Sequence, residues 1–105
     1  MNAQDPTEKA YLETRYTCEA LRILLRRSGY KEKAKALSSA MKQLCAELRA
    51  HLARQGRDRV ASTFDPSLLQ TPITTLLEDC RAKAERLYRQ TGSKAARIII
   101  ETIGN

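Results

Sequence analysis

Apolar residues recur every three or four positions from residue 30 to residue 55, which is the longest such run in the chain. On a helical wheel they share one stripe, as in a helix that faces a core: Tyr30, Ala34, Leu37, Met41, Leu44, Cys45, Leu48 and Leu52. No Gly or Pro interrupts the run, and Gly29 and Gly56 bound it. The pattern predicts an amphipathic helix over 30–55, around which the other segments pack.

A second helix is predicted before it, from Asp5 to about Ser28. Asp5 is placed as N-cap, Pro6 suits the first helical position, and Glu8 is placed to reach back as in a capping box. Apolar residues cover most of this helix, so we expect it to touch two or more neighbours or a second subunit. The short joint at Ser28 and Gly29 predicts an antiparallel hairpin.

Residues 57–71 break the helical pattern and are interpreted as a connector. Within it, the sequence Asp65-Pro66-Ser67 predicts one short helical turn through Gln70. We expect the apolar residues of the connector, such as Phe64, to cap the end of the bundle, since long loops without such a role are uncommon.

The last two helices follow this connector. One is predicted over 72–91, with Thr71 as its N-cap and Gly92 as its end. A short apolar helix over 94–103, capped by Ser93, comes next. Its isoleucine triplet would suit a strand, but no other segment alternates apolar and polar residues to pair with it. A segment that docks on a second subunit is the alternative.

The fold class is therefore all-α: an antiparallel helical bundle of three main helices plus a short C-terminal helix. We expect one domain over residues 1–105, with 1–4 as a disordered tip. A helix over 30–55 is about 40 Å long, whereas a compact globule of this size is about 30 Å across. Either the molecule is elongated, or the helix is broken, or a second copy covers the overhang, and we expect a homodimer.

The charge balance points to acidic partners. The net charge is +7 and the pI is near 9.7, which favours nucleic acid, an anionic surface or an acidic protein. The chain has one Phe, four Tyr and no Trp, so stacking on exposed bases is not expected as its main binding mode.

Enzymatic and metal chemistry lacks the residues it needs. The single histidine, His51, has only Glu47 as a helical neighbour that could ligate a metal. A phosphate-accepting role for His51 is disfavoured because Gly56 ends the helix soon after it. No glycine-rich phosphate loop and no nucleophile–base arrangement is found. We therefore predict no catalytic residues, no metal and no cofactor.

The three cysteines are far apart and form no C-x-x-C pair, which favours reduced core thiols. No segment has the layout of a signal peptide, and no apolar run approaches the ~20 residues that cross a bilayer. We expect a cytoplasmic protein that does not bind membranes.

The candidate site is a set of basic residues that recur on the flanks of the helices. Charge stripes of this kind often do no more than keep a protein soluble, but phosphate contact needs cations along a ridge and no particular motif. The expected contacts are Arg15, Arg22, Arg26, Lys31, Lys35, Lys42, Arg49, Arg57 and Arg59.

The function predicted from these residues is that of a small basic non-enzymatic accessory protein, which contacts nucleic-acid backbone within a larger assembly. The alternative is a protein-binding regulator or inhibitor that places a helical face on an acidic partner. Its candidate surfaces are the Ile98–Ile103 segment and the connector around Phe64.

One short stretch resembles a known protein family. The residues Phe64-Asp65-x-x-Leu68-Leu69-x-Thr71, followed by Thr74-Thr75-Leu76, are similar to part of the primosomal replication-restart protein PriC. The resemblance covers about a dozen residues. The length of the chain and the position of the stretch do not match, so no functional residue is carried across.

Overall fold

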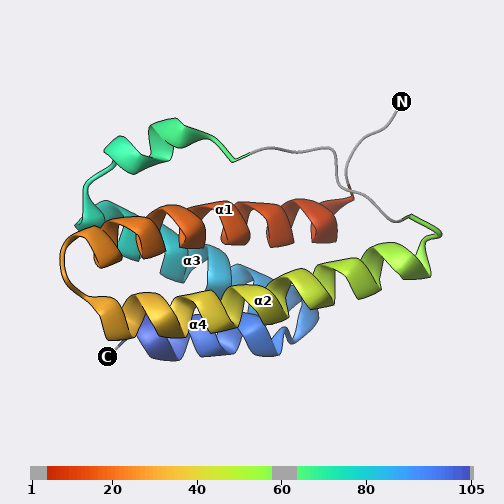
Figure 1. The fold of residues 1–105 in the computed structure, drawn as a ribbon. Helices are drawn as coiled ribbons and strands as arrows, with labels where there is room; N and C mark the ends of the chain where they lie inside the picture. The colour runs from red at the N-terminus through yellow and green to blue at the C-terminus, as the bar shows by residue number, and fades with distance from the viewer. Residues whose placement is uncertain (1–4, 58–63, 105) are drawn as a thin grey trace.

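A computed structural model describes residues 5–57 and 64–104, and within these ranges every regular element is helical (Figure 1). The elements are α1 (Pro6–Arg27), α2 (Lys31–Arg54), the 3₁₀ helix η1 (Pro66–Gln70), α3 (Ile73–Thr91) and α4 (Lys94–Gly104). The predicted all-α class and helical bundle are confirmed, and each helix lies within two residues of its predicted bounds.

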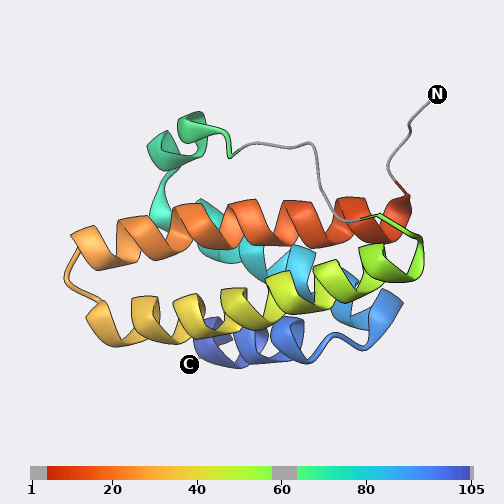
Figure 2. The ribbon, with the colours of Figure 1, turned by 45° about the vertical axis from the view of Figure 1, so that its right-hand side comes forward.

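The four α-helices pack as a ring in the order α1, α2, α4 and α3. Both α1 and α4 pack against α2 and α3, and the neighbouring helices run in opposite directions (Figures 1 and 2). Helices α2 and α3 therefore run in the same direction (Figures 1 and 2). The molecule measures 41 × 26 × 19 Å, so the 24 residues of α2, about 36 Å long, fit along its long axis within one chain.

The core is aliphatic and draws on all four helices. Its fully buried large apolar side chains are Leu21, Leu37, Leu44, Leu52, Leu76, Leu87 and Ile99. The isoleucine triplet is helical, with Ile99 in the core and Ile98 at the surface. As α4 contributes Ala95, Ala96 and Ile103 to the same core, the C-terminal segment is part of the bundle.

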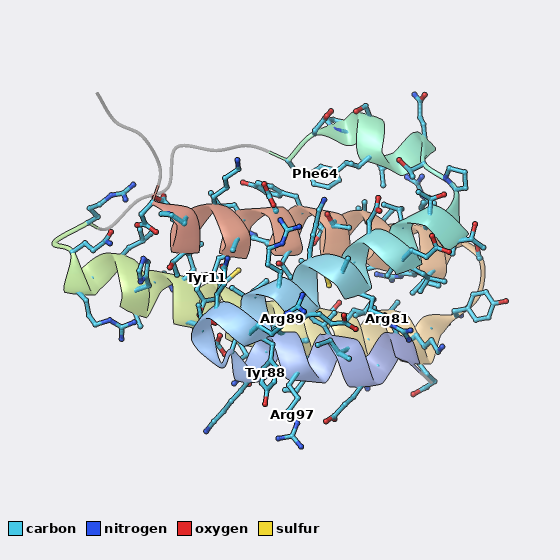
Figure 3. All side chains as sticks on the ribbon, turned by 180° about the vertical axis from the view of Figure 1, so that it is seen from behind. Tyr11, Phe64, Arg81, Tyr88, Arg89 and Arg97 are labelled. Atoms are coloured by element: carbon cyan, nitrogen blue, oxygen red, sulfur yellow. The ribbon has the colours of Figure 1, made fainter. Side chains whose placement is uncertain are left out.

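The described part of the connector from Phe64 onward packs along the side of α1 and does not cap the end of the bundle, so that expectation is wrong for these residues. Helix η1 contacts α1, and the Phe64 ring meets the Tyr16 ring edge-on, with 6.2 Å between the centroids (Figure 3). The reason is the direction of α3, which begins at the end of the bundle where α2 also begins (Figure 1). Asp65 caps η1 by accepting a bond of 3.0 Å from the Ser67 N–H, as predicted.

Two glycines end α1 and α2 in the same way. Gly29 and Gly56 have φ of +93° and +71°, a region that glycine adopts without strain. The next residue then donates its N–H back into the helix, Tyr30 to the Leu25 carbonyl and Arg57 to the Leu52 carbonyl, both over 2.9 Å. These bonds satisfy carbonyls that the helix ends would leave unpaired, and they fix where Tyr30 and Arg57 leave the bundle.

Candidate nucleic-acid interface

Helices α1 and α2 enclose a long groove whose walls are mostly cationic. It consists of two hollows of about 360 and 510 Å³, which share Arg22 and Ser38 and so run into each other. We call it the basic groove, and its lining residues are Arg15, Glu19, Arg22, Arg26, Lys31, Ala34, Lys35, Ser38, Met41, Lys42, Cys45 and Arg49. Seven of the nine predicted contact residues thus meet in one place.

Helical spacing explains why these cations line up. On α2, Lys35, Lys42 and Arg49 are seven residues apart, so they recur on one side of the helix every two turns, about 10.5 Å along its axis. On α1, Arg15 and Arg22 have the same spacing. The hairpin at Gly29 turns the two rows toward each other, which gives the groove one basic wall from each helix.

Among the described residues that line the groove, seven are cations and one, Glu19, is a carboxylate. Glu19 pairs with Arg22 three positions along the same helix, which offsets one of the charges. The Arg15 guanidinium lies over the Tyr16 ring, 5.7 Å from its centroid. Lys35, Lys42 and Arg49 are exposed, so they can meet an anion with little loss of packing.

The floor of the groove is less polar than its walls. Met41 and the Cys45 thiol are half-buried there. Cys18 and Cys80 are fully buried in the core, where hydrogen bonding to the Cys80 thiol, together with burial, raises the pKa of Cys18 well above its usual value. Cys45 is therefore the cysteine that a reagent in solution can reach.

Arg57 lies apart from the basic groove, at the end of the bundle where α1 begins. Its guanidinium donates two bonds to the buried Glu8 carboxylate, Nη1 to Oε1 over 2.7 Å and Nη2 to Oε2 over 3.0 Å. The bond to Glu8 also raises the pKa of Arg57. Glu8 is thus held by Arg57, while its own N–H donates to Asp5 Oδ1 over 2.7 Å. The ninth predicted contact, Arg59, lies outside the described residues.

His51 belongs to this same end of the molecule. Its Nε2 lies 3.3 Å from each carboxylate oxygen of Asp5. The hydrogen bond from the Glu8 backbone N–H to the Asp5 carboxylate is the main cause that lowers the pKa of Asp5. Within residues 5–57 and 64–104 there is no group of three or more His, Cys, Asp or Glu side chains that could hold a metal ion.

Glu47 of α2 makes the main polar contact inside the bundle, which the sequence does not predict. Its carboxylate accepts bonds from the Ser93 hydroxyl, from the Tyr11 hydroxyl over 3.2 Å and from the Ala95 N–H over 3.1 Å. Ser93 in turn accepts from the Ala96 N–H over 3.0 Å, which confirms it as the cap of α4. Glu47 therefore ties α2 to α1 and to the start of α4, where a negative charge is favourable.

Compared with known protein families, characterised proteins and solved structures, the chain matches none of them. No helix in the described part of the chain is long and apolar enough to cross a membrane.

Proposed function

We propose that the protein is a small non-enzymatic accessory protein that contacts nucleic-acid backbone through the basic groove, as part of a larger assembly. The strongest support is that seven cations from α1 and α2 line the basic groove, while only one carboxylate is among the described lining residues. Phosphate groups form a regular row of negative charges, so a row of cations is the matching surface. Such contacts position a nucleic acid without reading its bases.

The length of the groove suits a short stretch of nucleic acid. From Lys31 to Arg49 the axis of α2 rises by about 27 Å. At about 3.4 Å per nucleotide along one strand, this length corresponds to about eight nucleotides. We therefore expect a binding site of that size, with Lys35, Lys42 and Arg49 each near a phosphate.

Salt and sequence dependence test this proposal. We expect labelled oligonucleotides of about 12 residues to bind at low salt, with a slope of log K against log[salt] of about −3 to −4, from roughly five neutralised phosphates. Two unrelated sequences should give the same affinity within a few-fold. Fluorescence anisotropy measures both quantities. If no DNA or RNA oligonucleotide binds at low salt, the proposed function is wrong.

A second candidate is a regulator that covers an acidic partner protein, and the groove floor is the observation that favours it. Met41 and Cys45 offer apolar contact that a phosphate backbone does not use. The surfaces first expected for this function are largely occupied, because Phe64 packs on Tyr16 and Ile99 and Ile103 are buried. Binding of an acidic amphipathic peptide, combined with no oligonucleotide binding, would favour this candidate.

The homodimer and the cytoplasmic location stay predictions. Two features suggested a dimer, the length of α2 and the apolar surface of α1, and a single chain accounts for both. The bundle is long enough for α2, and α1 is covered by α2, α3 and η1.

A further inference from the structure

Tyr30 stands at the tip of the α1–α2 hairpin, at one end of the basic groove. It is 58% exposed, which is more than any other large apolar side chain in the described part of the chain. A residue in this position, just after the glycine that ends a helix, commonly packs back on the last helical turn. The Tyr30 ring is instead largely open to solvent, although its sequence neighbour Lys31 and the nearby Arg26 line the groove.

The backbone at Tyr30 is held firmly. Its N–H donates to the Leu25 carbonyl over 2.9 Å, and its own carbonyl accepts from the Ala34 N–H over 3.1 Å. The left-handed φ of Gly29 completes the turn. A ring fixed on a rigid turn loses little backbone freedom when it binds a flat partner, so the position is well suited to stacking.

We propose that the basic groove takes a single-stranded nucleic acid and that Tyr30 stacks on one of its bases. This inference rests on the proposed function, since the cations supply the main attraction and the ring adds to it. An aromatic side chain can stack on any base, which keeps the binding independent of sequence. Paired bases inside a duplex are not free to stack on the ring, so Tyr30 favours single strands over duplexes.

The other tyrosines provide the comparison. Tyr11 is buried and bonds to Glu47, and Tyr16 is half-buried against Phe64. Tyr88 is 41% exposed, but it lies on α3, on the side of the molecule that also carries Arg89 and Arg97 (Figure 3). Tyr88 therefore offers a matched control, with similar exposure and cations nearby but no place in the groove.

The test compares Tyr30→Ala, Tyr30→Phe and Tyr88→Ala with the wild type, using one single-stranded oligonucleotide and the duplex of the same sequence. Tyr30→Ala should weaken single-strand binding about ten-fold, which is the usual effect of losing one stacked base. Its salt slope should be unchanged, and its duplex affinity should change less than about two-fold. Tyr30→Phe and Tyr88→Ala should bind as the wild type does. Circular dichroism melting checks that each variant is folded.

The outcomes separate the two proposals. If folded Tyr30→Ala binds the single strand as tightly as the wild type, the stacking proposal is overturned while the basic groove stands. If it weakens single-strand and duplex binding equally, stacking is also overturned, because a paired base cannot be the partner. If the wild type binds neither oligonucleotide at low salt, the proposed function itself fails.

Discussion

Replacing Lys35, Lys42 and Arg49 together by glutamate is expected to weaken oligonucleotide binding by about 100-fold or more at low salt. The three side chains are exposed and lie along one wall of the basic groove. Reversing the charge of these three side chains removes three phosphate contacts and adds three negative charges that repel the phosphates. The salt slope should fall in magnitude by about 2, since each neutralised phosphate contributes about 0.7 for a single strand. Anisotropy titrations at several salt concentrations measure both effects.

A matched control separates the position of the charges from their number. The variant with Arg86, Arg89 and Lys94 replaced by glutamate changes three exposed cations away from the groove. Each reversal lowers the net charge by two, so both triple variants fall from +7 to +1. The control should keep most of its affinity and the full salt slope. Equal losses in the two variants would show that net charge alone drives binding and that the groove has no special role.

Replacing Glu47 by alanine is expected to lower the free energy of unfolding by about 2–3 kcal/mol, which corresponds to a fall in Tm of about 10 °C. The change leaves the Ser93 and Tyr11 hydroxyls and the Ala95 N–H without their acceptor. It also removes a negative charge from the start of α4. Thermal and urea unfolding, followed by circular dichroism, measure the loss.

Two comparisons make the Glu47 result specific. Glu47→Gln keeps an oxygen that can accept some of these bonds, so it should lose about half as much stability. Glu85→Ala removes an exposed carboxylate on α3, and its stability should stay within about 0.5 kcal/mol of the wild type. A Glu47→Ala protein that melts with the wild type would show that these bonds do not hold α4 on the bundle.

The helices follow from local patterns, which is why the sequence predicts them well. The apolar stripe of α2, the Asp5 and Pro6 start of α1, and the caps at Asp65 and Ser93 all act within a few residues. The cation rows are local as well, because the seven-residue spacing of Lys35, Lys42 and Arg49 sets them on one side of α2.

The remaining features depend on contacts between residues that are far apart in the chain. In the sequence, Arg57 looks like one more surface cation. Its contact with Glu8 is not predicted, because the two residues are 49 positions apart. In the sequence, Glu47 stands out only as a helical neighbour of His51. Its contact with Ser93 cannot be predicted from local pattern, because the two residues are 46 positions apart. The direction of α3 was not predicted either, since nothing in the sequence of η1 indicates that this element packs along α1. Amphipathic patterns identify the faces of helices that are buried but do not say which helices meet.

The accessible thiol in the basic groove provides the most direct test of the central claim, that nucleic acid lies between α1 and α2. Cys45 lines the groove, whereas Cys18 and Cys80 are fully buried, so iodoacetamide should add one group to the native protein. The measurement is the rate of this addition by intact-protein mass spectrometry, with and without a saturating oligonucleotide at low salt. We predict that the bound oligonucleotide slows the modification of Cys45 several-fold and that high salt restores the rate. An unchanged rate, in a sample where anisotropy shows the oligonucleotide bound, would contradict binding in the groove.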